Sequence, residues 1–496
     1  MSGVELSLAL LGTLDLCLKH VYGGLIVEKY KPFRDAGNEI QERTLALEAT
    51  WSKLSQQLAF LRRISASLGE DYLVLQNEIV HDLQKKLEAA ALHISKVEEK
   101  AFGNRGKTGF LRKRKAAKHN LAAKKFLEAA ILDLQNWERR FDPTWFLLMR
   151  IANGVIDTEL AQRPETEKLS VARNVRESLK GLKEPTALFL AERGLTSAKL
   201  SDIPYSTLQT VEIPNLGAFI SDSADLSFMQ NASTFAIYAR RLASRLHEID
   251  ANTFHLLRCK GVVQRKDPST RQIISLDFIF NMPRGCSHPQ SLRSILLSQD
   301  DCTLGDRINL AKQLATSITF IHVLGFVHNN VRPETILVFQ DDQRPTQLGP
   351  LFLLGFKAFH TTYDNTQQWD ISAWEDDIYQ HQDRQRDYPE DYNNMQRDIY
   401  SLGVCLLEIG LWESFVDNER YKDHFVECGL RKEQYTTLAR EQLSRKMGEK
   451  YMNVVVNCLS CMDTSNEYFG NESEFQDSDG ILIGLKYIEK VHSIYE

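Results

Sequence analysis

The chain has 496 residues, of which 43% are hydrophobic and 25% charged, a composition typical of a soluble protein with enough residues for several domains. Its eight cysteines are scattered, and the N-terminus lacks the basic flank of a secretory signal, so we exclude a disulfide-rich secreted scaffold and expect a cytoplasmic protein. Residues 1–150 carry a net charge of +6 and the remainder −12. This asymmetry indicates either that the two parts bind different partners or that they bind each other.

An apolar stretch at residues 4–27 predicts the first helix. Its apolar residues recur at helical spacing, among them Leu11, Leu14, Leu18 and Val21. Asp15 and Lys19 interrupt the stretch four residues apart, where they could pair on one helix face, and make it a poor transmembrane span. Two interpretations stay open: a helix of a soluble bundle, or a helix stored in a bundle that can transfer to a membrane.

Three further amphipathic helices follow. A heptad-type seam runs through residues 47–61, a second pattern covers 72–100, and a third covers 127–137 and ends before Pro143. Four such helices in about 140 residues are typical of an antiparallel helical bundle. We therefore predict an all-α bundle at residues 1–150.

A strongly basic segment separates the last two of these helices. Residues 103–125 contain nine lysines and arginines and no acidic residue. The densest part consists of Arg112, Lys113, Arg114, Lys115 and Lys118. This is either a solvated loop or a patch for anionic lipids, since each basic side chain near such a surface contributes about 1 kcal/mol. Nucleic acid is the weaker interpretation, because no aromatic platform accompanies the cluster, and we expect no such partner.

The rest of the chain predicts a helical linker and a second domain. Residues 151–204 are polar and interrupted by prolines, so we expect a helical brace or linker there. From about residue 205 short β-like runs at 235–238, 261–264 and 273–280 precede a mainly helical part. The expected fold class is multidomain, with the bundle followed by an α+β domain at 205–496.

The strongest motif lies at residues 318–339, ITFIHVLGFVHNNVRPETILVF. It resembles the protein-kinase catalytic loop H-R-D-L-K-P-E-N with the helix that precedes it. His328 is retained, whereas Asn330 replaces the catalytic aspartate. Arg332 stands for the lysine, and Thr335 replaces the asparagine that binds metal.

Two more segments follow in kinase order and at kinase spacing. FLLGFKAF resembles the region of the D-F-G motif, with Gly355 at the position of the metal-binding aspartate and Phe356 at that of the phenylalanine. RDIYSLGVCLLEIGLW, residues 397–412, matches the helix whose aspartate braces the catalytic loop, and Asp398 keeps that position. The resemblance implies a bilobal protein-kinase-like fold whose structural core includes His328, Phe356 and Asp398.

These replacements have direct chemical consequences. Asn330 carries no charge and cannot accept a proton from a substrate hydroxyl. Gly355 has no side chain to hold Mg²⁺, and Thr335 is a poor second ligand. Phosphoryl transfer depends on positioning and charge neutralisation, so we predict a pseudokinase that is not an enzyme, has no cofactor and does not bind Mg-ATP.

The nucleotide-facing side of the small lobe is degenerate as well. We place the glycine-rich loop at residues 215–222, NLGAFISD, where Gly217 is the one glycine and Asp222 would repel a triphosphate. The strand expected to carry the phosphate-binding lysine reads TFAIYARRL and offers Tyr238 or Arg240, depending on the register.

Taken together, the chain resembles fungal proteins that pair an N-terminal HeLo-type helical bundle with a degenerate kinase-like domain. The resemblance rests on LALLGTLDLCLKHVYGGL, WERRFDPTWFLLMRI, LLGFKAF and DIYQHQDRQ. In the last segment Gln380 and Gln382 replace an arginine and a proline of the family pattern. HeLo-type bundles permeabilise membranes in heterokaryon incompatibility, and the architecture is similar to that of the mixed-lineage kinase domain-like proteins of animals.

The resemblance implies a role in programmed cell death or non-self recognition. Our leading hypothesis is that the pseudokinase regulates the bundle, which is recruited to anionic lipids of the plasma membrane on a signal from an upstream protein. One rival is an interaction scaffold whose bundle only forms homo-oligomers. Another is an atypical serine/threonine protein kinase that binds ATP.

Overall fold

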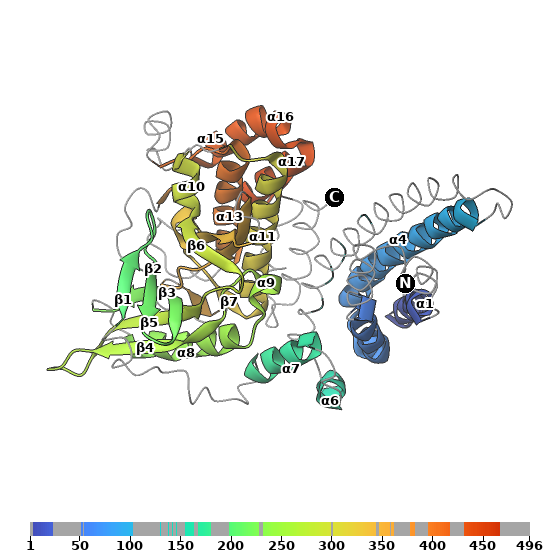
Figure 1. Ribbon diagram of the computed structural model, residues 1–496, viewed down its shortest axis with the longest axis horizontal. Coiled ribbons are helices and arrows are strands. Elements are labelled where there is room, and N and C mark those ends of the chain that lie inside the picture. The colour runs from blue at the N-terminus through green and yellow to red at the C-terminus, as the bar shows by residue number, and fades with distance from the viewer. Residues whose placement is uncertain are drawn as a thin grey trace, which may run out of the picture. The chain divides into compact units, whose positions relative to one another are not determined.

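A computed structural model describes residues 3–22, 51–52, 54–102, 129, 137, 141, 145, 154–162, 167–179, 198–227, 232–298, 301–343, 347–357, 359–361, 377–381, 395–416 and 431–466. The chain divides into two compact units, Met1–Arg173 and Asn174–Glu496, each taken separately below (Figure 1). Helices make up the described elements of the first unit, and the second combines helices with antiparallel sheets. The expectation of a multidomain protein with mixed helix and sheet is thereby confirmed.

The first unit is built around the contact of α1 (Gly3–Tyr22) with α4 (Glu70–Phe102). On α1, Leu10, Leu14 and Cys17 are fully buried, as the helical spacing of its apolar residues requires. Asp15 pairs with Arg62 rather than with Lys19, at 2.5 Å. Residues 54–64 form another helix, followed by the 3₁₀ turn η2 (Ser65–Ser67). The predicted helix at 72–100 is present as α4.

Three aromatic residues in helical positions pack against these helices. Trp137 donates its indole hydrogen to the Ile79 carbonyl at 2.8 Å and stacks on Phe141, with ring centroids 4.7 Å apart. Trp145 meets Phe60 edge to face at 5.2 Å. All are fully buried or nearly so. Since an aromatic pair contributes about 0.5–1.5 kcal/mol beyond its buried area, this cluster stabilises the unit substantially.

Short helices lie in the segment predicted as a brace. These are α6 (Gly154–Gln162) and α7 (Glu167–Leu179). Arg63 forms an ion pair with Glu159 of α6 at 2.9 Å, which holds α6 against the rest of the first unit. The first strand, β1 (Lys199–Asp202), begins inside the same segment and belongs to the sheet of the second unit, ahead of the predicted boundary at 205.

A five-stranded antiparallel sheet opens the second unit, in the order β1-β2-β3-β5-β4. Its other strands are β2 (Gln209–Ile213), β3 (Gly217–Asp225), β4 (Cys259–Lys266) and β5 (Ile273–Asn281). Alternation along β5 explains its two faces: Ile279 joins the apolar cluster of Val211, Phe219 and Val263, whereas Phe278 and Phe280 point toward the ring of Phe356. Both strands predicted at 261–264 and 273–280 are confirmed.

The predicted strand at 235–238 is wrong. This segment belongs to α8 (Ala232–His247), which packs on β4 and β5 and is followed by the short α9 (Ala251–Phe254). Four consecutive apolar residues suggested a strand, but burial from Phe235 to Leu246 recurs every three to four residues and so follows a helix. Tyr238 and Arg240 therefore lie on a helix, where Tyr238 is half-buried and Arg240 exposed.

The predicted phosphate loop at 215–222 is also corrected. Residues 214–216 form a tight turn, and Ile213 pairs with Gly217, which starts β3 at a φ of +96°. Glycine is suited to that backbone conformation because it has no Cβ. Phe219 and Asp222 consequently lie within a strand and are buried.

Helices form the other side of the second unit (Figure 1). They are α10 (Leu292–Ser298), α11 (Leu304–Val323), α13 (Met395–Leu411), α15 (Arg431–Leu438), the π-helical η8 (Ala439–Leu443), α16 (Ser444–Met447) and α17 (Glu449–Leu459). All residues of α13 are buried, so this helix is the centre of the helical part.

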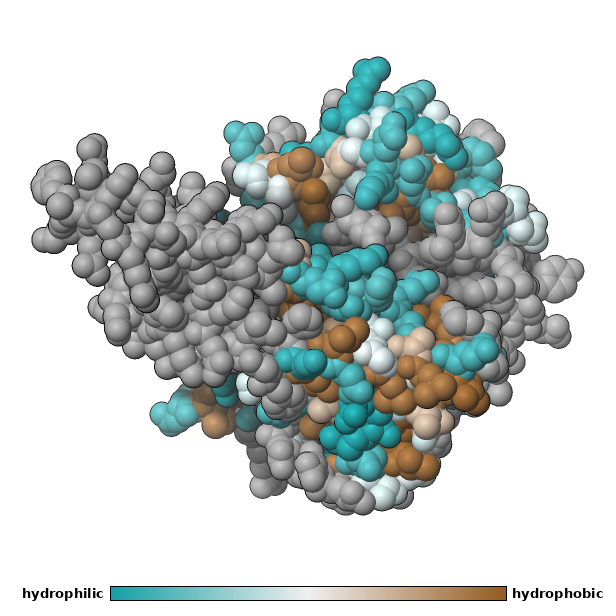
Figure 2. All heavy atoms as spheres, turned by 90° about the vertical axis from the view of Figure 1, so that its right-hand side faces the viewer, coloured by the Kyte–Doolittle hydropathy of each residue, from teal (hydrophilic) through white to brown (hydrophobic). Residues whose placement is uncertain are grey.

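Two small sheets complete the described part of the second unit. One has the order β6-β8-β9, with β6 (Cys286–Ser291), β8 (Ile336–Asp341) and β9 (Leu348–Leu353), and the 3₁₀ turn η4 (Pro333–Thr335) leads into β8. The other pairs β7 (Phe326–Val327) with β10 (His360–Thr361). Within the described ranges, every helix is too short or too polar to cross a membrane. Figure 2 shows hydrophobic patches scattered among hydrophilic ones on one face of the molecule.

Candidate functional site

The kinase-like motif segments meet around the buried carboxylate of Asp398. It accepts hydrogen bonds from the backbone amides of His328 and Asn329, at 2.7 and 2.8 Å, and contacts His322 Nε2 at 2.9 Å. Burial alone would raise the pKa of Asp398. The interaction with His322 and the hydrogen bond from the His328 backbone amide outweigh burial and hold this pKa below its usual value. An acceptor that is ionised at neutral pH thus fixes the loop that follows β7.

His328 continues this core toward the sheet. Its ring is fully buried and meets Phe356 edge to face, with centroids 5.0 Å apart, and Phe356 in turn lies 5.9 Å from Phe280 of β5. Burial lowers the pKa of His328 to about 4, so the ring is neutral at physiological pH. The three rings form an apolar connection between the sheet and the helical half.

Three of the four degenerate positions lie together and are joined by hydrogen bonds. Asn330 donates its side-chain amide to the Gly355 carbonyl at 2.8 Å. The Thr335 hydroxyl lies 2.9 Å from the carbonyls of both Asn330 and Arg332, which share its one hydrogen. These groups are therefore committed to internal hydrogen bonds. Arg332, the fourth position, is buried, and burial lowers its pKa.

Gly355 leaves no room for a side chain. Its φ is +88°, and a Cβ placed there would lie 2.3 Å from Thr335 Cγ2 and 3.0 Å from Asn330 Nδ2. A carboxylate at this position would thus require both backbone strain and displacement of Thr335. The local packing is specific for glycine.

Asp222 of β3 is a site residue that sequence reasoning placed in a loop rather than in a strand. Its buried carboxylate accepts hydrogen bonds from the backbone amides of Gly355 at 3.0 Å and Phe356 at 2.6 Å. Burial raises the pKa of Asp222 to about 6, although these two bonds and nearby Lys357 oppose the shift. The alternating pattern of residues 217–225, read as a strand, is the signal that could have placed it.

Replacing Asp222 by asparagine is expected to change how stability depends on pH. The pKa of Asp222 is about 6 in the folded chain and about 4 in the unfolded chain. Between pH 4 and 6 the Asp222 carboxyl is therefore protonated in the folded chain but ionised in the unfolded chain. The resulting stabilisation is fully present below pH 4 and is lost as pH rises through 6, by about 3 kcal/mol.

Asparagine keeps an oxygen acceptor for the two amides but does not ionise. The free energy of unfolding of Asp222→Asn minus that of the wild type, from urea titrations at pH 4 to 7, should therefore increase with pH. A difference independent of pH would show that Asp222 titrates normally. Asp267→Asn is the comparison variant, since the exposed Asp267 has a pKa lowered to about 2 by Ser269 and Thr270.

The connection between β1 and β2 is bonded to the helical half of the second unit. Ser206 donates its hydroxyl to the Glu334 carbonyl at 2.6 Å, and Ser291 donates to the Pro204 carbonyl at 2.7 Å. Ile203 and Leu208, which flank this turn, are buried. The turn is thereby held next to the loop that contains Asn330 and Thr335.

A buried ion network surrounds Arg293 of α10. Its guanidinium pairs with Glu334 at 2.9 Å and with Glu408 of α13 at 2.8 Å, and it donates to the hydroxyl of Tyr379. Tyr379 also donates to Glu408 at 2.8 Å. Nothing in the sequence singled out Arg293, because its partners lie 41 to 115 residues away. The network joins α10, α13 and η4.

The predicted membrane residues lie partly within the described chain. Leu14 and Leu18 face the interior of the first unit, and Leu11 is half-buried. Val21 belongs to α1, but its side chain lies outside the described residues, as does the whole basic cluster of Arg112, Lys113, Arg114, Lys115 and Lys118. The outward face of α1 instead exposes Val4, Leu8 and Leu16, at 71, 62 and 44%.

The cysteine pair of α17 and its C-terminal turn is buried. Burial raises the pKa of Cys458 to about 12, and the Cys461 thiol donates to the Gln396 carbonyl at 3.2 Å. In the part of the chain that the structure describes, no three histidine, cysteine or acidic residues lie close enough to hold a metal ion. Comparison with protein-family models gives no match, and comparison with curated proteins gives none either.

Proposed function

We propose that the second unit is a protein-kinase-like regulator without catalytic activity, and that it controls a membrane-active helical first unit. One observation carries the proposal: Asn330, Thr335 and Gly355 bond to one another where a kinase needs two metal ligands and a base. Two of these positions hold neutral side chains and the third holds none. The arrangement can stabilise a loop but cannot neutralise a transferring phosphoryl group.

The order of elements supports the kinase resemblance. Five antiparallel strands with α8 between the third and the fourth precede a helical half, and the motif segments surround the junction. In protein kinases the third strand carries the lysine that binds phosphates. The third strand here carries Asp222, whose negative charge would repel a nucleotide phosphate and whose oxygen binds the 355–356 backbone instead.

The effector role of the first unit rests on charge and apolar surface. Residues 103–125 carry nine basic residues without an acid, and α1 exposes Val4, Leu8 and Leu16. Stable membrane attachment usually needs two such signals, because one alone gives marginal and reversible binding. We infer that anionic lipids of the plasma membrane are the target, in programmed cell death or non-self recognition.

The rival functions make different predictions. A scaffold that only forms homo-oligomers would bind neither neutral nor anionic lipid, although its second unit would look the same. An atypical kinase would bind ATP with Mg²⁺ and turn it over. Lipid binding therefore separates the first two functions, and phosphotransfer separates the third.

Catalytic silence is the direct test of the second unit. The purified full-length chain should transfer no radiolabelled phosphate from ATP to itself or to generic substrates, and ATP with Mg²⁺ should not shift its melting temperature. The reason is the absence of a base at 330 and of a carboxylate at 355. ATP turnover by the wild type that disappears in Asn330→Ala would contradict this assignment. The control is Asn281→Ala, which makes the same change away from the loop.

A further inference from the structure

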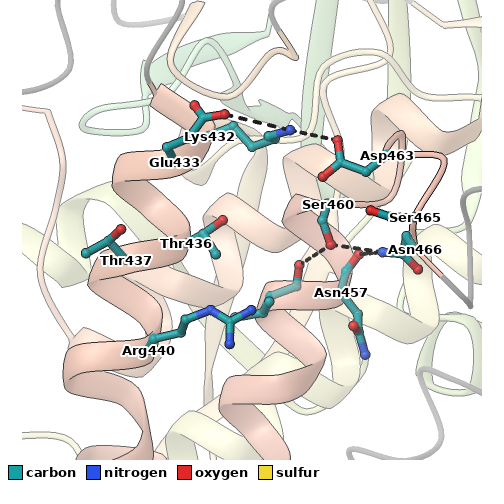
Figure 3. Close-up of a pocket in the computed structure, with 11 residues that line it drawn as sticks. Lys432, Glu433, Thr436, Thr437, Arg440, Asn457, Ser460, Asp463, Ser465 and Asn466 are labelled. Atoms are coloured by element: carbon teal, nitrogen blue, oxygen red, sulfur yellow. Dashed lines mark hydrogen bonds and ion pairs between the residues drawn. The ribbon is translucent and has the colours of Figure 1, made fainter.

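A polar groove lies in the helical half of the second unit, separate from the site described above. Helices α15 and α17, η8 and the turn after α17 enclose a volume of about 580 Å³ (Figure 3). None of its lining residues belongs to the kinase-like motif segments. Its volume falls within the range of small-ligand sites, about 300–1,000 Å³.

The lining excludes several classes of ligand. Val456 is the one apolar residue among the eleven that line the groove, and none is aromatic. An acyl chain or the apolar face of a helix would find no matching surface, and a base or sugar ring would have nothing to stack on. The remaining side chains are hydroxyls, amides and charged groups, which favour a small polar ligand.

One end of the groove is electrically balanced. Lys432 lies 2.7 Å from Asp463 and 3.9 Å from Glu433, so its charge is offset by two carboxylates. In Figure 3 this pair bridges α15 and the turn after α17. An anion would gain little electrostatic binding energy at this end, because the Lys432 charge is already neutralised.

Arg440 dominates the other end. Within the described ranges, no acidic residue forms an ion pair with its exposed guanidinium. The hydroxyls of Thr436 and Thr437 lie on the same wall and take part in none of the described hydrogen bonds. Arginine presents planar, paired donors that match the oxygens of phosphate and carboxylate groups.

The opposite wall is fixed by internal bonds. Ser460 donates to the Val456 carbonyl at 2.8 Å, and Asn466 donates to Ser460 at 2.9 Å and to the Asn457 carbonyl at 3.0 Å. The side-chain amide of Asn457 is left to face the groove (Figure 3). A wall held in this way loses little entropy when a ligand binds.

Arg440 is also placed by an uncommon backbone. It belongs to η8, a π-helical stretch of five residues between α15 and α16. Such segments interrupt helices at some cost in stability and are frequent at functional sites. Two independent features coincide at Arg440: its guanidinium forms no ion pair within the described part of the chain, and a π-helix carries it.

We infer that this groove binds a phosphate monoester, with Arg440 as the main contact and Thr436 and Asn457 as further hydrogen-bond donors. A dianionic phosphate suits this end better than a carboxylate because it offers three oxygens to several donors. The inference goes beyond the proposed function, since a phosphate-reading groove would serve a scaffold equally well. It supplies a place at which a phosphorylated signal could reach the second unit.

The test uses the full-length chain and three probes: inorganic phosphate, a pentapeptide with phosphoserine at its centre, and the same peptide unphosphorylated. Binding is followed by ³¹P line broadening and by fluorescence anisotropy of the labelled peptides. We expect saturable binding of a phosphorylated probe and none of the unphosphorylated peptide. Tighter binding of the phosphopeptide identifies a protein partner, and equal binding of inorganic phosphate identifies a small phosphorylated ligand.

Two substitutions localise the contact. Arg440→Gln should weaken binding at least tenfold, and Arg440→Lys should weaken it less because the charge remains. Arg445→Gln, at an exposed arginine of α16 outside the groove, should leave binding unchanged. Equal melting temperatures establish that the variants are folded. Failure of both phosphorylated probes to bind at millimolar concentration, or full binding by Arg440→Gln, would overturn the inference.

Discussion

Membrane binding by residues 1–173 is expected to be lost when the four basic residues at 112–115 are replaced by glutamate. Each basic side chain near an anionic surface contributes about 1 kcal/mol, so removing four lowers affinity by about 4 kcal/mol, roughly a thousandfold. Reversal adds repulsion to that loss. Co-sedimentation with liposomes containing anionic lipid measures the effect, and wild-type binding should weaken as salt is raised.

The control reverses two charges elsewhere in residues 1–173 and is compared with the Lys113→Glu/Lys115→Glu pair of the cluster. Lys19 and Lys85 are exposed and form none of the described ion pairs. Their replacement by glutamate should reduce binding only slightly, because the effect depends on a local cluster. Equal losses in both variants would mean that net charge, rather than the 112–115 cluster, determines attachment.

Asp398→Ala should destabilise the second unit strongly. The substitution leaves the buried amides of His328 and Asn329 without their acceptor, at about 1–3 kcal/mol each. It also removes the partner of His322. We expect the free energy of unfolding to fall by about 2–6 kcal/mol in urea titrations monitored by fluorescence.

A matched variant separates this effect from a general loss of negative charge. Asp301 is exposed and lies just before α11, and Asp301→Ala should change stability by less than about 0.5 kcal/mol. If Asp398→Ala lowered the free energy of unfolding no more than Asp301→Ala, the hydrogen bonds from the His328 and Asn329 amides to Asp398 would not be what holds the loop at 328–332.

Sequence reasoning placed the motif residues of 328–335 well because they are local. His328, Asn330 and Thr335 lie in one short segment, and their spacing alone indicates that they share a loop. Phe356 and Asp398 follow at distances that the kinase resemblance supplies. In the structure His328 contacts Phe356, and its backbone amide donates to Asp398.

The structure of residues 205–240 was harder to predict because their sequence patterns conflict over short distances. FAIY is apolar at four successive positions, which by itself favours a strand. The helix becomes evident only when the spacing of the buried residues as far as Leu246 is considered. Asp222 lies within β3 rather than in the predicted loop. The Pro214–Leu216 turn is short, so the sequence does not mark clearly where the strand begins. The bonds of Arg293 and of Ser206 join residues 41 to 128 positions apart, which no local pattern encodes.

Dye leakage from anionic liposomes tests the central claim most directly, with residues 1–173 and the full-length chain compared at equal concentration. The proposal predicts rapid leakage with the isolated first unit, little with the full-length chain, and none from neutral liposomes with either. Leakage that is absent with residues 1–173, or equal with both proteins, would contradict a membrane-active unit under the control of a kinase-like regulator.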